Sequence, residues 1–264
     1  PRMEAAEDAA AHIDETRALT REFLGIDIDG MWPPEGAVSL EALELFGAAN
    51  VAWTVADETT LQMARGEDYE RSDDLYRPWM VEGAVTPEIF FGDRQIRRLC
   101  MRGPGSDLSA VTANPEEVAA DVVRELEDEA AVGDDADVVT IALDGDAFGE
   151  QYESGGIHML EALFEGIAES NELTATTPSE TLEARSKQVE HLESVPPTTH
   201  DEGSFRRWIG GEYTNRAWEL LGRARSELLE HEDEMSPAHR RHAWEALYSA
   251  EGRDWFRWYG DESF

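Results

Sequence analysis

The chain has 264 residues, of which 41% are hydrophobic, and its 58 acidic and 22 basic side chains give a formal net charge of −36. This length and composition predict one large or two modest domains with a buried core, and they exclude a disordered chain. The charge excludes phosphate backbones and anionic membranes, so we expect no nucleic-acid partner and no membrane, and a neutral substrate is favoured. Because the acidic residues are spread along the whole chain and arginine nearly replaces lysine, we interpret the charge as adaptation to high salt.

The single cysteine, Cys100, excludes an internal disulfide and a cysteine-based metal site. We expect it to be a small buried hydrophobic residue. There is no run of eighteen apolar residues and no charged-then-apolar leader, so we expect neither a membrane span nor export, and a cytoplasmic location. A chain that begins with Pro1 is expected to be a processed product or a piece of a longer protein.

The first predicted elements lead to a carboxylate. Helical spacing predicts a helix over residues 3–24, and alternating apolar and polar residues predict a short strand over residues 25–29. In the next segment, residues 30–36 (GMWPPEG), two prolines fix φ and prevent a helix from starting at Glu35. This side chain is therefore expected where a strand has just ended, which is where βα folds place their chemistry. On this motif alone, the alternative is a solvated loop glutamate.

Further elements follow the same pattern. After a helix that Ser39 is expected to cap, apolar strands are predicted at residues 51–56, 87–92 and 138–143, and each is followed by an aspartate. The last of these strands reads as buried on both faces. A turn-rich loop is expected at residues 103–109 and a short strand at 173–176, and helices are predicted at 115–131, at 156–170 and from Pro178 onward.

This alternation predicts an α/β fold with a parallel sheet or barrel and right-handed crossovers. The carboxyl ends of such strands share one face, so Glu35, Asp57, Asp93 and Asp144 are expected to converge. After residue 196 the composition changes, and we expect an exposed loop at 200–205 and then helices. We therefore divide the chain into a (β/α) barrel catalytic region, residues 1–195, and a C-terminal helical region, residues 196–264.

Two carboxylates that share a desolvated pocket can take different protonation states, one acting as a nucleophile and the other as a general acid. Cleavage of a glycosidic bond with retention uses such a pair at about 5–5.5 Å. Tryptophan and tyrosine rings stack on sugars, although each is more often a core residue; the candidates are Trp32, Trp79, Trp208, Trp255, Trp258 and Tyr259. The sequence contains no HExxH motif, phosphate loop or Gly-x-Ser-x-Gly elbow, and Asp144-Gly145-Asp146 is too short to predict an ion site.

The segment 30–36 resembles the nucleophile motif of family 57 glycoside hydrolases, the α-amylase, amylopullulanase and 4-α-glucanotransferase group, and residues 139–146 (VTIALDGD) resemble its general acid/base motif. The resemblance continues through residues 152–163, 177–180, 208–218 and 255–261. It implies a distorted (β/α)7-type barrel followed by a helical region, which acts on α-glucans with no cofactor and no required metal. By this resemblance Glu35 is the nucleophile and Asp144 the acid/base, and the substrate-binding residues are Trp32, Asp57, Asp93, Arg94, Trp208, Trp258 and Asp261.

Three departures from the family pattern leave alternatives open. The early His-Gln-Pro and Gly-Asn strands have no counterpart, so we expect a barrel that is incomplete at its N-terminus and lacks an N-terminal segment or a partner chain. Residues 97–102 and Arg257 also differ from the family pattern. The alternative function is a non-catalytic glucan-binding or assembly subunit that needs a separate chain. Hydrolysis versus transglycosylation, and α-1,4 versus α-1,6 preference, stay open.

Overall fold

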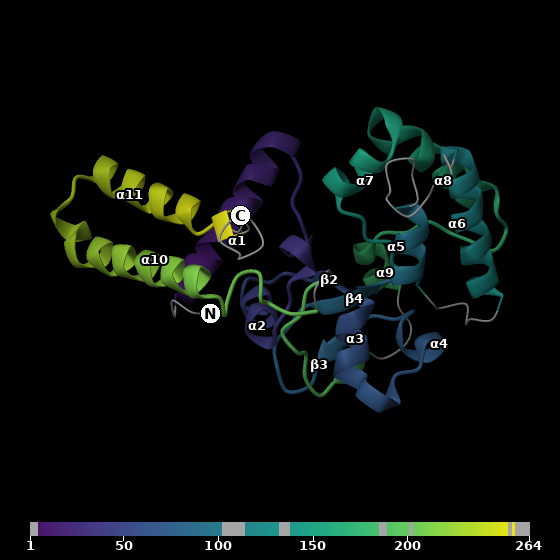
Figure 1. Ribbon diagram of the computed structural model, residues 1–264, viewed down its shortest axis with the longest axis horizontal. Helices are drawn as coiled ribbons and strands as arrows, with labels where there is room; N and C mark the ends of the chain where they lie inside the picture. The colour runs from purple at the N-terminus through teal and green to yellow at the C-terminus, as the bar shows by residue number, and fades with distance from the viewer. Residues whose placement is uncertain are drawn as a thin grey trace.

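The computed structural model describes residues 5–101, 114–131, 138–184, 189–200, 203–252 and 255–256. In this part of the chain, helices surround a five-stranded sheet, which confirms the predicted α/β class (Figure 1). The strands lie in the order β1-β2-β4-β3-β5. They are β1 (Gly30–Met31), β2 (Trp53–Asp57), β3 (Trp79–Val81), β4 (Glu88–Gly92) and β5 (Glu190–Leu192).

Three of the strands are parallel neighbours and end at one edge. Met31 of β1 pairs with Thr54 of β2, and Asp57 of β2 pairs with Gly92 of β4. The other two strands were not predicted. β3 runs antiparallel to β4, and β5 runs parallel to β3. Each has three residues, which is too short for an alternating pattern to stand out in the sequence.

The helices confirm most of the periodic segments. Residues 3–24 contain α1 (Ala6–Leu24), and the Oγ of Ser39 accepts a hydrogen bond from the backbone N of Ala42 at 3.3 Å, as a cap of the next helix should. The remaining helices are α2 (Leu40–Ala48), α3 (Glu58–Arg65), α4 (Arg71–Asp74), α5 (Arg94–Cys100), α6 (Pro115–Ala130), α7 (Gly145–Gln151), α8 (Ile157–Glu169), α9 (Pro178–Ala184), α10 (Glu212–His231) and α11 (Pro237–Ala250).

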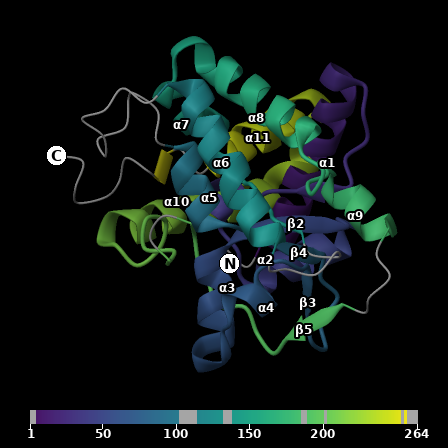
Figure 2. The ribbon, with the colours of Figure 1, turned by 90° about the vertical axis from the view of Figure 1, so that its right-hand side faces the viewer.

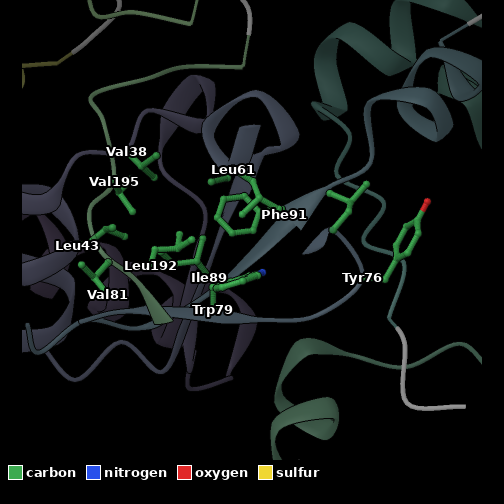
Figure 3. Close-up of a cluster of buried hydrophobic side chains, with 12 residues drawn as sticks. Val38, Leu43, Leu61, Tyr76, Trp79, Val81, Ile89, Phe91, Leu192 and Val195 are labelled. Carbon is green, nitrogen blue, oxygen red and sulfur yellow. The ribbon is translucent and has the colours of Figure 1, made fainter. Parts of the chain in front are cut away.

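One hydrophobic core joins the sheet to the helices beside it. Figure 3 shows Ile89 and Phe91 of β4 beside Leu61 of α3 and Trp79 of β3. Ile89 and Phe91 are two residues apart and so share one face of the sheet, and both are almost completely buried. Burial of each such side chain contributes roughly 1.5–3 kcal/mol, which fixes the register of β4.

A second core lies among α5, α6, α7 and α8. α6 and α8 pack side by side (Figure 2). Their approach is close, because a Cβ on Gly166 would lie 2.8 Å from the Cγ2 of Val123. Cys100 is completely buried in this core, as predicted.

The C-terminal helices α10 and α11 form a hairpin that packs beside α1 (Figure 1). The guanidinium of Arg225 in α10 donates to both oxygens of Asp8, at 2.6 and 3.0 Å. The Nε2 of His12 lies 2.9 Å from the Oε2 of Glu251, the residue that follows α11. The helical region predicted after residue 196 is therefore present, and it contacts the first helix of the chain.

Three strand predictions were wrong. Residues 25–29 form no strand, because Gly25 ends α1 in the left-handed region (φ 71°) and Ile26 is 52% exposed. Residues 138–143 are half-buried, and they pair with β4 through a single parallel bridge between Thr140 and Gly92. They do not extend this pairing along β4, because β3 already pairs with β4 at Ile89. Residues 173–176 have no strand structure.

The loop predicted at 103–109 lies outside the described residues. None of the helices in the described residues is long and apolar enough to cross a membrane.

Candidate active site

Glu35 lies on a strained turn directly after β1. The turn, Pro34–Gly36, is closed by the backbone N of Gly36, which donates to the carbonyl of Pro33 at 2.9 Å. Glu35 itself has φ 56° and ψ 20°, which is left-handed backbone and uncommon for a residue with a Cβ. Such a conformation costs on the order of 1 kcal/mol and is concentrated at functional sites.

The Glu35 side chain is buried against a histidine and an arginine from a distant segment. Its carboxylate is only 10% exposed; Oε2 lies 3.5 Å from the Nε2 of His200 and 3.9 Å from the Nη1 of Arg207. The backbone N of His200 also donates to the carbonyl of Glu35 at 3.0 Å. The interpretation of Glu35 as a solvated loop residue is therefore wrong. The loop expected to be exposed at 200–205 is half-buried at His200 and at residues 203–205, and residues 201–202 lie outside the described residues. The His200 side chain is 8% exposed.

Asp57 ends β2 and caps α3. Its Oδ1 accepts a hydrogen bond from the backbone N of Thr59 at 2.9 Å. Arg94 and Arg97 of α5 approach the same carboxylate at 3.7 and 3.9 Å. Because the Asp57 side chain is 4% exposed, these two arginines offset the cost of burying its charge.

Asp93 follows β4 and is held entirely by protein groups. One oxygen caps α5 by accepting from the backbone N of Gln95 and of Ile96, at 2.8 and 3.0 Å. The other accepts from Arg71 at 2.7 Å and from the Tyr76 hydroxyl at 3.3 Å. Burial and the negative charge of Asp93 raise the pKa of Tyr76, which keeps its hydroxyl a donor.

Arg71 connects the ends of β2 and β4. Its guanidinium donates to Asp93 and, at 2.8 Å, to Glu58. Burial works against its charge, yet its hydrogen bonds to Asp93 and Glu58 and their charges raise the pKa of Arg71. Glu58 and Asp93, which follow β2 and β4, therefore both accept hydrogen bonds from the guanidinium of Arg71.

Asp144 begins α7. Its Oδ1 accepts from the backbone N of Ala147 at 2.9 Å, so helix capping fixes the orientation of the carboxyl group. Within the part of the chain that the structure describes, Oδ2 receives no hydrogen bond. The side chain is half-buried, in the segment whose Thr140 pairs with Gly92.

A narrow hollow joins these strand ends. Its lining comes from the turn after β1, from the ends of β2 and β4, from the segment before Asp144, and from α5 and His200; the residues are Trp32, Ala56, Asp57, Gly92, Arg97, Ala142 and His200. The common edge expected from the sequence is therefore present. Trp32 and Ala142 belong to its two outermost segments, and both line this one hollow.

Several expected site residues lie elsewhere. The ring of Trp208 packs edge-on against Phe205, 6.1 Å between centroids, and the Trp208 carbonyl accepts from Trp218. Trp208 is not among the residues that line the hollow. Trp258 and Asp261 lie outside the described residues. In that described part, no group of three His, Cys, Asp or Glu side chains could hold a metal ion.

Sequence reasoning missed the contacts of His200, Arg207 and Arg97. His200 and Arg207 lie far along the chain from Glu35, and no local pattern marks them. Arg97 was noted only as a departure from the family pattern. Only composition could have pointed to these residues, because histidine and arginine are both scarce in a chain with 58 acidic residues.

Comparison of the chain with known proteins identifies its family. Residues 1–196 match the family model described as glycosyl hydrolase family 57. No protein with a curated description matches the chain. Among solved structures, the GH57-type branching enzyme of Pyrococcus horikoshii has a TM-score of 0.75 at 14% identity, over 96% of this chain and 56% of that one.

Two further structures are similar. The α-amylase AmyC of Thermotoga maritima has a TM-score of 0.70 at 16% identity, over 99% of this chain and 60% of that one. The 4-α-glucanotransferase of Thermococcus litoralis has a TM-score of 0.55 at 18% identity, over 86% of this chain and 31% of that one. The chain thus spans less than two thirds of each of these proteins. With three quarters of its length matched by the family model, the chain belongs to glycosyl hydrolase family 57.

Proposed function

We propose that the chain is the catalytic region of a retaining enzyme that acts on α-glucans, with Glu35 as nucleophile and Asp144 as general acid/base. The observation that carries this proposal is the Glu35 carboxylate, buried on a strained turn at a strand end and flanked by His200 and Arg207. Family membership supports it, as do the similar structures, which are named as a branching enzyme, an α-amylase and a 4-α-glucanotransferase.

In this mechanism an oxygen of Glu35 attacks the anomeric carbon while Asp144 donates its proton to the departing glycosidic oxygen. The carbon–oxygen bond to the leaving sugar breaks, and a glycosyl ester forms on Glu35. Asp144, now ionised, takes a proton from water or from a sugar hydroxyl, whose oxygen attacks the same carbon. Two inversions give net retention, and the second acceptor decides between hydrolysis and transfer.

The common edge supports the pairing of Glu35 with Asp144. β1, β2, β4 and the Thr140 segment are neighbours in that order, so the outer two would be roughly 14 Å apart if the sheet were flat. Trp32 and Ala142, from the two outer segments, line one hollow, whereas Glu35 and Asp144 are not among the residues that line it. Retention requires the two carboxyl groups to lie about 5–5.5 Å apart.

A neutral sugar suits this site. Trp32 lines the hollow and is 38% exposed, so its indole is accessible to a sugar ring for stacking. Asp57 and the nearby arginines supply charged groups that hydrogen-bond to hydroxyls.

The test uses the full-length protein in molar salt with soluble starch, and follows reducing-sugar release, transfer products and branch formation. Glu35→Gln and Asp144→Asn should each lower turnover by at least about a thousandfold while glucan binding remains. The matched controls are Glu44→Gln and Asp146→Asn, which change exposed carboxylates nearby. Binding of glucan without turnover in the parent would instead support the non-catalytic glucan-binding subunit.

A further inference from the structure

The segment after β5 brings His200 and Arg207 to Glu35 and is itself firmly anchored. Thr198 exchanges two backbone hydrogen bonds of 3.0 Å with Val38, just beyond the Glu35 turn. Its hydroxyl lies 2.7 Å from the hydroxyl of Thr60 in α3. Both threonines are completely buried. The position of His200, two residues later, is therefore fixed by the same core that supports the sheet.

His200 contacts Glu35 through both its backbone and its side chain. Its backbone N holds the Glu35 carbonyl at 3.0 Å, and its ring reaches the carboxylate at 3.5 Å. The fit around the turn is tight, since a Cβ on Gly36 would lie 3.3 Å from the Nδ1 of His200. On its other side, the ring lies 6.3 Å from that of Trp32, in the hollow itself.

We propose that His200 and Arg207 are positioning residues for Glu35: they hold its carboxylate in the orientation for attack. This inference rests on the proposed function. A carboxylate on a side chain that is 10% exposed loses most of its hydration, and the polar groups of His200 and Arg207 beside it replace part of that loss. Of the two, Arg207 carries a permanent charge at 3.9 Å and His200 supplies a directional contact.

The expected kinetics follow from this role. With an aryl α-maltooside as substrate, His200→Ala and Arg207→Met should each lower kcat about ten- to a hundredfold with little change in KM. Arg207→Lys should restore part of the loss, because it returns the charge. The matched controls are His191→Ala and Arg206→Met, which change exposed residues and should leave kcat within about twofold.

Chemical rescue separates positioning from simple structural support. In Glu35→Gly, external azide attacks the anomeric carbon, a carbon–nitrogen bond forms, and the aryl oxygen leaves with the proton of Asp144, giving a glycosyl azide of inverted configuration. If His200 acts through the carboxylate, adding His200→Ala should leave this azide-rescued rate within about twofold. An equal loss in both backgrounds would overturn the inference.

A readout that does not need turnover distinguishes the two proposals. In ¹⁵N spectra, the imidazole signals of His200, assigned by their loss in His200→Gln, should move in Glu35→Gln and stay in place in Glu44→Gln. If the ¹⁵N chemical shifts of the His200 imidazole do not change in Glu35→Gln, the positioning role is overturned, even if the enzyme is active. A coupled signal in a parent without turnover supports the contact and instead rejects the proposed function.

Discussion

Individual positions in this protein are constrained by how closely backbone segments approach. Gly47 lies in the last turn of α2, where a Cβ would clash with the Val85 carbonyl oxygen. Gly149 lies within α7, where the closest atom to an added Cβ would be 3.7 Å away. The two glycines therefore differ in packing although both are helical.

We predict opposite effects for two glycine-to-alanine substitutions. Alanine favours a helix over glycine by about 1 kcal/mol, so Gly149→Ala should raise the free energy of unfolding slightly. In Gly47→Ala the clash with Val85 should outweigh this gain and cost about 1–3 kcal/mol. Urea titration in molar salt measures both. Equal effects in the two variants would contradict the packing argument.

A second residue-scale prediction concerns Cys100. Its side chain is completely buried, and burial raises the pKa of the Cys100 thiol to about 12. Because the thiolate is the reactive form, alkylation by iodoacetamide at pH 8.5 should be undetectable in the folded protein and complete in denaturant. Mass spectrometry follows the modification. Rapid labelling of the native protein would show that the α5–α8 core opens readily.

Among the elements, the longer helices could be predicted, whereas the short helices α3, α4, α5 and α7 and the short strands could not. α2 and α11 have local start signals, a serine whose hydroxyl accepts from the third backbone N of the helix. β3 and β5 have three residues each and exist because they pair with each other and with β4. Residues 138–143 have strand composition, yet β3 already occupies their place beside β4. Whether such a segment forms a strand depends on its pairing with distant segments, which no local sequence pattern predicts.

The candidate site, too, could be predicted from the sequence only in part. Asp57, Asp93 and Asp144 each follow an apolar run and Glu35 follows a proline-stiffened turn, so the chain itself predicts their common edge, although the strand predicted before Glu35 was misplaced. His200 and Arg207 reach that edge because Thr198 pairs with Val38, a contact that spacing alone does not reveal. The family resemblance also supplied Trp208, whose ring the structure places against Phe205.

The contact of α1 with α11 should make stability depend on pH. The hydrogen bond to Glu251 raises the pKa of His12 above its usual value near 6.5. The stabilisation is therefore fully present below about pH 6.5 and is lost as the pH rises through the folded-state pKa. His12 is 44% exposed, so the effect should stay below about 1 kcal/mol. Thermal unfolding from pH 5 to 8 measures it, and His12→Gln should remove that part of the pH dependence.

At the scale of the whole molecule, we expect stability to depend on net charge and salt. The net charge of −36 creates repulsion that salt must screen, and the Debye length grows from about 3 Å at 1 M to about 10 Å at 0.1 M. We predict that the far-ultraviolet circular dichroism of the folded protein decays as salt is lowered from molar to millimolar. Sucrose at equal osmolality is the control. A signal that does not change with salt would contradict adaptation to high salt.

The β1 edge predicts association. β1 has two residues and, in the described part of the sheet, pairs only with β2. Leu19, Phe23 and Leu24 of α1 and Ile26 after it are between 42 and 76% exposed, which makes an apolar surface in the N-terminal part of the chain. We expect light scattering of the 264-residue chain in molar salt to detect oligomers, which a segment carrying the family's His-Gln-Pro and Gly-Asn strands should disperse. A monodisperse, fully active monomer would contradict the incomplete barrel.

The long-range contacts of this fold also set the order in which it can form during synthesis. Arg17 of α1 donates to the carbonyls of Ala49 and Asn50, which are made soon after it, whereas Arg225 and Glu251 lie 217 and 239 residues later than their partners Asp8 and His12. The Glu35 turn likewise waits for His200 to emerge. A ribosome stalled before that residue would carry a nascent chain whose Glu35 carboxylate lacks this contact, and activity should therefore appear late, after the sheet has already formed.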